Sequence, residues 1–254
     1  MHTILKFYLL VSFLIFSGIL YANETEGNEA NHSLKLDKDG VKVYIFTRKG
    51  SKFATFKAIT HINASLDSIL AVMFDNKSCT EWVYSCEDSF VIEDVSFNER
   101  YHYQICDIPF PFQDRDFIFH SIMKQDLESK IVTITMSSAA QYCHGNSSEQ
   151  CKKVNQSKLV RVKKTIGTYK LEPKVSGTKI TWIQHTDPAG NLPSWLVNQF
   201  IKDTPYWTLK QLAEKVKEEK YKYAKLVYDN QGNAVALNTP AQKTAKDFGV
   251  YPTF

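Results

Sequence analysis

The sequence lacks the short motifs that mark the common enzyme classes. It contains no Gly-x-Ser-x-Gly nucleophile turn, no phosphate-binding loop, no Gly-x-Gly-x-x-Gly dinucleotide motif and no His-Glu-x-x-His metal motif. Its seven histidines are scattered, and no two have the spacing of metal ligands. We therefore expect no cofactor, no metal site and no enzymatic activity.

A long basic block is also missing. The chain has 31 Lys and Arg residues against 27 Asp and Glu residues, a net charge of +4, and the two signs are interspersed. This pattern does not indicate a nucleic-acid partner. The densest basic stretch, residues 152–164, is interpreted as a solvated strand face, with a dock for acidic phospholipid head groups as the alternative.

The N-terminal segment has the order of a secretory signal peptide. One positive side chain precedes an apolar run from Phe7 to Leu20, and a possible cleavage site at Ala22 and polar residues follow. We expect residues 1–22 to be a signal peptide and the protein to be exported, to a periplasm or the extracellular space. An uncleaved membrane anchor is the alternative, although a span needs roughly 20 apolar residues.

Five cysteines fit an exported protein. Cys143 and Cys151 bracket a polar loop between two strand patterns, and Cys79 and Cys86 bracket a second short segment. Each pair is close enough in sequence to close a small disulfide loop, the former being favoured. Cys106 is expected to be a free, buried thiol.

The remaining residues, about 230, suit one large β-rich domain. Residues 65–75 have helical periodicity, and a long amphipathic helix with Pro205 inside it follows Pro193. From residue 219 to 254 the chain turns polar, and we expect a weakly packed tail. Alternation and turn residues predict strands at 41–47, 53–62, 89–95, 100–108, 116–124, 131–138, 159–171 and 178–186. Neighbouring hairpins of this kind indicate an antiparallel meander covered by the last helix.

The segment from Pro109 to Phe117 is the most distinctive in the chain. Proline has no N–H for a sheet ladder, so Pro-Phe-Pro-Phe is read as a stiff connection that delivers Arg115 and Asp116 to the start of an apolar strand. A charge at that place is costly unless it is paired or functional. Arg115 is interpreted either as a structural partner of Asp114 or Asp116, or as part of a site.

Four segments together resemble the START domain, the lipid-transfer fold related to the steroidogenic acute regulatory protein. They are Asp75–Trp82, Pro109–Phe117, the stretch from Trp182 to Pro193, and the helix that contains Pro205. The resemblance covers residues 36–218. It implies an α+β helix-grip fold, in which a curved antiparallel β-sheet wraps around a long C-terminal α-helix and encloses a tunnel for one lipid.

The resemblance also suggests where the ligand binds. Arg115, Phe117, Phe119 and Ser121 share one face of their strand, and the family places the position of Ser121 in the tunnel. Sterol-carrying members have a second arginine at that position, so sterol specificity does not carry over. The expected ligand-binding residues are Trp82, Tyr103, Arg115, Phe117, Phe119, Ser121, Trp182 and Phe200, although these aromatic side chains are also compatible with a solid core.

We therefore expect an exported monomer that binds and carries one lipid or other hydrophobic small molecule without chemistry, with transient contact to a membrane surface. Two alternatives remain. The first is a helix-grip enzyme, a cyclase or hydrolase acting on a hydrophobic substrate, for which His185, Glu93 and Asp116 are the candidate groups. The second is an interaction module without a ligand.

Overall fold

The computed structural model describes residues 32–239. The expected signal peptide at residues 1–22 lies outside them, as does the end of the polar tail beyond residue 239. The described elements are β1 (Ser33–Lys38), β2 (Val41–Thr47), β3 (Ala54–Ile62), α2 (Leu66–Phe74), the short η2 (Asn76–Ser78), α3 (Cys79–Trp82), β4 (Cys86–Ser96), β5 (Glu99–Cys106), β6 (Arg115–Gln125), β7 (Val132–Ser138), α4 (Glu149–Asn155), β8 (Val160–Arg161), β9 (Lys164–Lys174), β10 (Gly177–Asp187), α5 (Ser194–Lys215), α6 (Glu219–Lys222), β11 (Lys225–Tyr228) and β12 (Ala234–Asn238).

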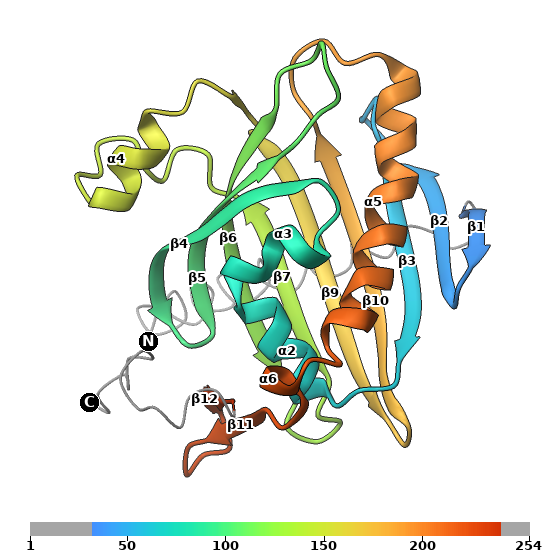
Figure 1. Ribbon diagram of the computed structural model, residues 1–254, viewed down its shortest axis with the longest axis vertical. Coiled ribbons are helices and arrows are strands. Elements are labelled where there is room, and N and C mark those ends of the chain that lie inside the picture. The colour runs from blue at the N-terminus through green and yellow to red at the C-terminus, as the bar shows by residue number, and fades with distance from the viewer. Residues whose placement is uncertain (1–31, 240–254) are drawn as a thin grey trace, which may run out of the picture.

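One curved, ten-stranded sheet forms the body of the molecule. Nine of its strands run in the order β1-β2-β3-β10-β9-β7-β6-β5-β4 with antiparallel neighbours, and the short β8 pairs in parallel with the start of β6. Figure 1 shows α5 lying along the sheet in front of β3 and β10, with α2 and α3 beside it. The predicted helix-grip fold is confirmed.

Local sequence explains where the two main helices begin. The Ser65 hydroxyl accepts a hydrogen bond from the Ser68 amide at 3.1 Å and caps α2. Pro193 occupies the N-cap of α5, where its fixed φ is compatible with helix entry. Pro205 is buried within α5 and does not interrupt it. The helix is therefore one continuous element that reaches from one end of the sheet toward the other.

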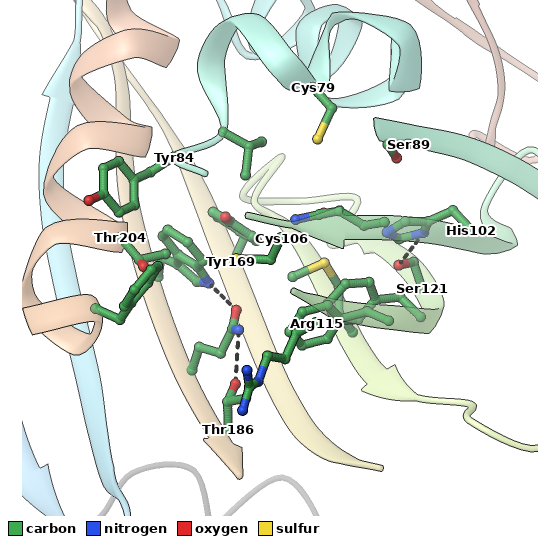
Figure 2. A pocket seen from close by; sticks show the side chains of 18 of the residues that line it. Cys79, Tyr84, Ser89, His102, Cys106, Arg115, Ser121, Tyr169, Thr186 and Thr204 are labelled. Carbon is green, nitrogen blue, oxygen red and sulfur yellow. Dashed lines mark hydrogen bonds between the residues drawn. The ribbon is translucent and has the colours of Figure 1, made fainter. Parts of the chain in front are cut away.

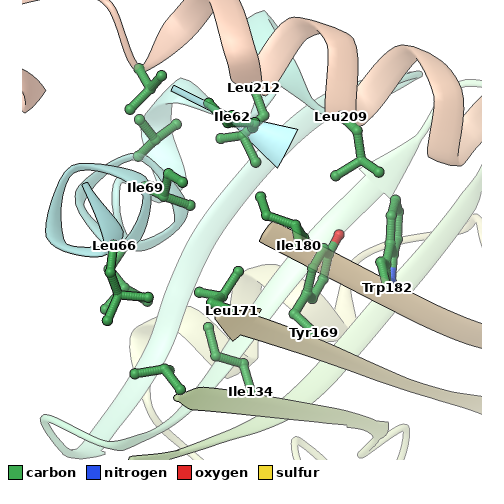
Figure 3. Packing of buried hydrophobic residues seen from close by; sticks show 14 of the residues in the cluster. Ile62, Leu66, Ile69, Ile134, Tyr169, Leu171, Ile180, Trp182, Leu209 and Leu212 are labelled. Carbon is green, nitrogen blue, oxygen red and sulfur yellow. The ribbon is translucent and has the colours of Figure 1, made fainter. Parts of the chain in front are cut away.

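The core lies between the sheet, α2 and the second half of α5. Leu209 and Leu212 project from α5 toward the sheet and are completely buried, as are Leu171 and Ile180 on the strands below (Figure 3). Fully burying a leucine or isoleucine side chain contributes roughly 1.5–3 kcal/mol. This half of the space beneath α5 is therefore solid, and any ligand has to lie toward the other half.

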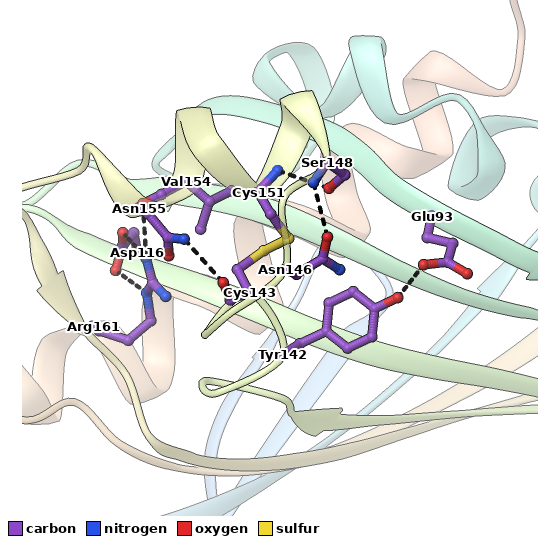
Figure 4. Close-up of a disulfide and its surroundings, with 10 residues drawn as sticks. All are labelled: Glu93, Asp116, Tyr142, Cys143, Asn146, Ser148, Cys151, Val154, Asn155 and Arg161. Atoms are coloured by element: carbon purple, nitrogen blue, oxygen red, sulfur yellow. Dashed lines mark hydrogen bonds and ion pairs between the residues drawn. A yellow bond between two sulfur atoms is a disulfide. The ribbon is translucent and has the colours of Figure 1, made fainter.

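A second, smaller core covers the outer face of β4, β5 and β6. The segment around α4 packs there and carries the Cys143–Cys151 disulfide, whose sulfurs are buried beside Val154 (Figure 4). Both predicted disulfides, this one and Cys79–Cys86, are confirmed, and Cys106 is a free thiol.

Beneath α4 lies a buried ion pair. Arg161 donates from Nε to Asp116 Oδ1 at 2.6 Å and from a terminal nitrogen to Oδ2 at 2.8 Å, and the Tyr103 hydroxyl donates to Oδ2 at 2.7 Å. Burial opposes ionisation of Asp116, but these hydrogen bonds hold the pKa of its carboxyl below the usual value. Asp116 therefore fixes β8, the strand that follows α4, to β6.

The start of the polar tail is ordered, in contrast to the weak packing that its composition predicted. Residues 219–238 form α6 and the β11-β12 hairpin, and Tyr221, Leu226 and Ala234 are buried in the main core. The physical reason is that a few apolar side chains, spaced to one side of a short hairpin, are enough to dock it although most of its residues are polar.

Candidate functional site

A cavity of about 240 Å³ opens between the sheet, α3 and the first half of α5. Its walls come from β3 to β7, β9, β10, α3, and the loop that leads into α5. This volume is just below the roughly 300–1,000 Å³ typical of small-molecule pockets, and the lining is mostly apolar and aromatic, as such pockets are. The space beneath the N-terminal half of α5 is therefore not filled by side chains.

Seven of the eight expected ligand-binding residues line this cavity. They are Trp82, Arg115, Phe117, Phe119, Ser121, Trp182 and Phe200. On β6, alternation places four of the seven on the inner face, and the rings of Phe117 and Phe119 are stacked at 5.1 Å between centroids.

Tyr103 is the exception and corrects the expectation. It lies on the outer face of β5, where its ring packs in the smaller core and its hydroxyl bonds to Asp116. Its aromatic character reflects the α4 segment that covers this face, which the sequence pattern did not reveal. The inner face of β5 instead carries Arg100, His102 and Gln104, none of which was predicted.

The missed residues on β5 had a signal in the sequence. Residues 100, 102, 104 and 106 alternate with Tyr101, Tyr103 and Ile105, so each set lies on one face of the strand. Because α4 buries the outward face as well, both sets are covered, and the rule that apolar side chains face the main core fails here. Other unpredicted lining residues, such as Tyr84, Met136 and Gln184, come from elements far apart in the chain.

Ser121 lies beside the imidazole of His102 and opposite Arg100 across the ladder. Its hydroxyl lies 3.5 Å from Nδ1 of His102, across the ladder between β5 and β6 (Figure 2). Burial, with a smaller effect of the nearby Arg100, lowers the pKa of His102 to about 3. The imidazole is therefore neutral at any physiological pH, so this pair can exchange hydrogen bonds with a ligand but supplies no charge.

Arg115 occupies the opposite end of the cavity, on the side of Thr186 (Figure 2). Its guanidinium donates to the backbone carbonyls of Pro188 at 3.2 Å, Ala189 at 3.1 Å and Gln113. The expected structural partners are not used, because Asp116 is paired with Arg161. Asp114 accepts a hydrogen bond from the Ile108 amide. Arg115 instead joins the loop before β6 to the loop before α5.

Two aromatic side chains lie exposed at this end of the molecule. Phe110, in the loop before β6, is 97% exposed, and Trp195, in the first turn of α5, is 62% exposed. The Arg115 hydrogen bonds hold these loops together, and Figure 1 shows both at the top of the molecule. Leu192 and Val197, close to Trp195 in sequence, and Ile108, close to Phe110, line the cavity, so both exposed rings belong to segments that border it.

None of the three groups considered for catalysis faces the cavity. His185 lies on the far side of the sheet, where its two ring nitrogens are 3.1 Å from the hydroxyls of Ser51 and Thr55. Glu93 accepts a hydrogen bond from Tyr142 beside α4, and Asp116 is paired as described. Within residues 32–239 no group of three His, Cys, Asp or Glu side chains is arranged to hold a metal ion.

The thiol of Cys106 lines the cavity, and burial raises its pKa to about 12. Since the thiolate is the nucleophilic form, this cysteine is unreactive. Among the helices of the described part of the chain, none is long and apolar enough to cross a membrane.

Comparisons with known proteins agree with this geometry. A family model described as the START domain matches residues 32–221. A protein of Pseudomonas aeruginosa described as uncharacterized is 30% identical over 189 residues, which are 73% of this chain and 88% of that protein.

Two solved structures are also similar. That of a STAR-related lipid transfer protein from Xanthomonas axonopodis is 26% identical, with a TM-score of 0.65, covering 74% of this chain and 99% of that one. Human StAR-related lipid transfer protein 5, 14% identical with a TM-score of 0.63, covers 84% and 97% and shows the shared fold.

Proposed function

Because this chain belongs to the START domain family, whose members bind lipids or other hydrophobic ligands, we propose that it binds a single lipid in the cavity beneath α5 and carries it unaltered. The observation that supports this most directly is the cavity itself, since apolar and aromatic side chains surround a volume that no side chain occupies. The stacked rings of Phe117 and Phe119 would contact the acyl or ring portion of the ligand, opposite Phe200 on α5.

The polar groups of the cavity support transport rather than chemistry. The pKa of about 3 makes His102 a weak base, and Cys106 is protonated at physiological pH, so neither is suited to act as a general base or nucleophile. Ser121 stands where sterol-carrying relatives are expected to have an arginine. We therefore propose a ligand other than a sterol for this chain.

We also propose that the protein is exported and acts as a monomer without a nucleic-acid partner. The two disulfides are consistent with an oxidising compartment. The expected signal peptide at residues 1–22 would deliver the protein to a periplasm or to the extracellular space.

The mouth of the cavity is proposed to touch the membrane while lipid is exchanged. Phe110 and Trp195 would enter the interface, since exposed aromatic side chains gain free energy by leaving water. Their place beside Leu192 and Val197 would bring the cavity opening to the lipid surface.

The double variant Phe110→Ser with Trp195→Ser is expected to bind vesicles of phosphatidylethanolamine and phosphatidylglycerol at least tenfold more weakly, as measured by co-sedimentation. Loss of two partly inserted aromatic side chains accounts for an effect of this size, because about 1.4 kcal/mol corresponds to a factor of ten. The matched control is Val175→Ser, an exposed apolar residue in the β9-β10 turn at the far end of the sheet. Equal sedimentation of the double variant and the wild type would exclude this surface.

Lipid capture tests the proposed function itself. The purified protein is incubated with vesicles made from total lipid of the host, re-isolated by gel filtration, and extracted with organic solvent. We expect one lipid per protein, with the polypeptide unmodified and the lipid chemically identical to that in the vesicles. Recovery of folded protein without lipid would contradict binding, and recovery of altered lipid would favour the enzyme alternative.

A further inference from the structure

Two arginines line the cavity, and they differ in how their charge is balanced. Arg100 forms a salt bridge with Asp94 at 3.0 Å and donates to the Asn76 side chain at 3.2 Å. Asp75, the only carboxylate among the lining residues, is likewise paired, with Lys220 at 3.2 Å. Arg100 and Asp75 are therefore each neutralised by an ion-pair partner within the protein.

Arg115 has no such partner. Its side chain is buried, with the residue only 4% exposed, and within residues 32–239 no carboxylate oxygen lies within 4.0 Å of its nitrogens. Its three hydrogen bonds go to neutral backbone carbonyls. Asp114 lies close enough to favour the charged form of Arg115, but it forms no ion pair with the guanidinium and accepts a hydrogen bond from the Ile108 amide at 2.8 Å. Asp187 accepts a hydrogen bond from the Ala189 amide at 3.1 Å.

A buried cation without a directly bonded counter-ion is unusual in proteins, because moving a charge out of water is costly unless an opposite charge compensates. Burial accordingly lowers the pKa of Arg115, although a guanidinium remains protonated at physiological pH. A guanidinium has five N–H groups, and the three backbone carbonyls account for three of them. Arg115 therefore carries a positive charge that no ion pair within residues 32–239 neutralises, and two further N–H donors, at one end of an apolar cavity.

We infer that the natural ligand is an acidic lipid, whose anionic oxygen head group, a carboxylate or a phosphate, lies against Arg115. This inference rests on the proposed function and adds the chemical class of the ligand. The side chains of Gln184 and Thr186, which line the same wall, add neutral hydrogen-bonding groups beside the guanidinium. The apolar part of the lipid then extends past Phe117 and Phe119 toward the uncharged pair of Ser121 and His102.

Three probes of equal chain length test this assignment: dodecanoate, dodecyl phosphate and dodecan-1-ol, each titrated below its micelle concentration and followed by tryptophan fluorescence. At pH 8 we expect at least one of the two anions to bind ten or more times more tightly than the alcohol. Whichever anion binds more tightly identifies the source of the head group. The preference is expected to disappear in Arg115→Met and to persist in Arg48→Met, a matched arginine beside His185 on the far side of the sheet that does not line this cavity.

Since Arg115 also joins two loops, a second measurement uses the wild type alone. Dodecanoate labelled with ¹³C at its carboxyl is titrated in the bound state, and its pKa is expected to lie below that of the free acid because the guanidinium stabilises the carboxylate. Dodecan-1-ol that binds as tightly as the anions, or an unshifted carboxyl pKa, would overturn the acidic-lipid assignment while leaving lipid binding intact. Failure of all three probes to bind would contradict the proposed function as well.

Discussion

Ser121→Trp is expected to abolish lipid binding while the ligand-free protein keeps its melting temperature. Ser121 is buried on the inner face of β6, with Arg100 and Met136 as its neighbours across the two ladders. All three residues line the cavity, so an indole ring at position 121 would enter volume that the lipid otherwise occupies. In a filled core, the same overpacking would cost roughly 1–3 kcal/mol of unfolding free energy.

The control places the same ring on the other side of the sheet. Thr135 is exposed on β7, between two residues that line the cavity, so Thr135→Trp changes side-chain size without entering the cavity. This variant should retain its lipid. A strongly lowered melting temperature in ligand-free Ser121→Trp would indicate a solid core, and unchanged lipid binding in a stable variant would place the site elsewhere.

Asp116→Asn is expected to destabilise the protein by roughly 3–5 kcal/mol, the range for removing one partner of a buried ion pair. Asp116 is completely buried, and the change leaves the Arg161 guanidinium without its counter-ion. For a domain of this size each kcal/mol corresponds to about 2–4 °C in melting temperature. Calorimetry at pH 7 should therefore show a fall on the order of 10 °C.

The effect of Asp116→Asn should also depend on pH in a defined direction. The folded-state pKa of Asp116 is below its unfolded value of about 3.9, so its contribution is fully present above that value and is lost as the pH falls through the folded-state pKa. The difference between variant and wild type is thus constant from pH 5 to 8 and shrinks in acid. Asp88→Asn, at an exposed pair with Lys153 near the same helix, should cost no more than about 1 kcal/mol. A loss of similar size in both variants would contradict the structural role of Asp116.

Much of the fold was predictable because the decisive signals are local. Alternation gave β2 with its observed bounds, and periodicity together with Ser65 and Pro193 gave the two main helices. The single strand expected at 159–171 is divided into β8 and β9, because residues 160–161 pair with the start of β6 before the chain crosses to pair with β7 and β10. That crossing depends on tertiary partners, so no local pattern reveals it.

The residues of the site were predictable on β6, where the inward-facing side chains form a clear alternating set. They were not predictable on β5, where both faces of the strand are covered by other parts of the protein. On β6, alternation together with the family resemblance identified Phe117, Phe119 and Ser121 as inward-facing. On β5, no face was assigned, and Tyr103 was chosen for its aromatic ring. The α4 segment covers Tyr103 from outside, whereas His102, which lines the cavity, was missed. Two hydrogen-bond partners of Arg115, the carbonyls of Pro188 and Ala189, lie more than 70 residues further along the chain, and no local sequence pattern reveals this contact.

The most direct measurement of the central claim is native mass spectrometry of the mature protein purified from its own host. We expect folded monomer that carries one retained lipid, released on activation in the gas phase and identified after extraction as an acidic species. The cavity-filled Ser121→Trp variant, purified in parallel, should give the mass of the polypeptide alone. Wild-type protein that is folded, monomeric and free of any bound lipid would contradict the claim that the cavity beneath α5 is a lipid site.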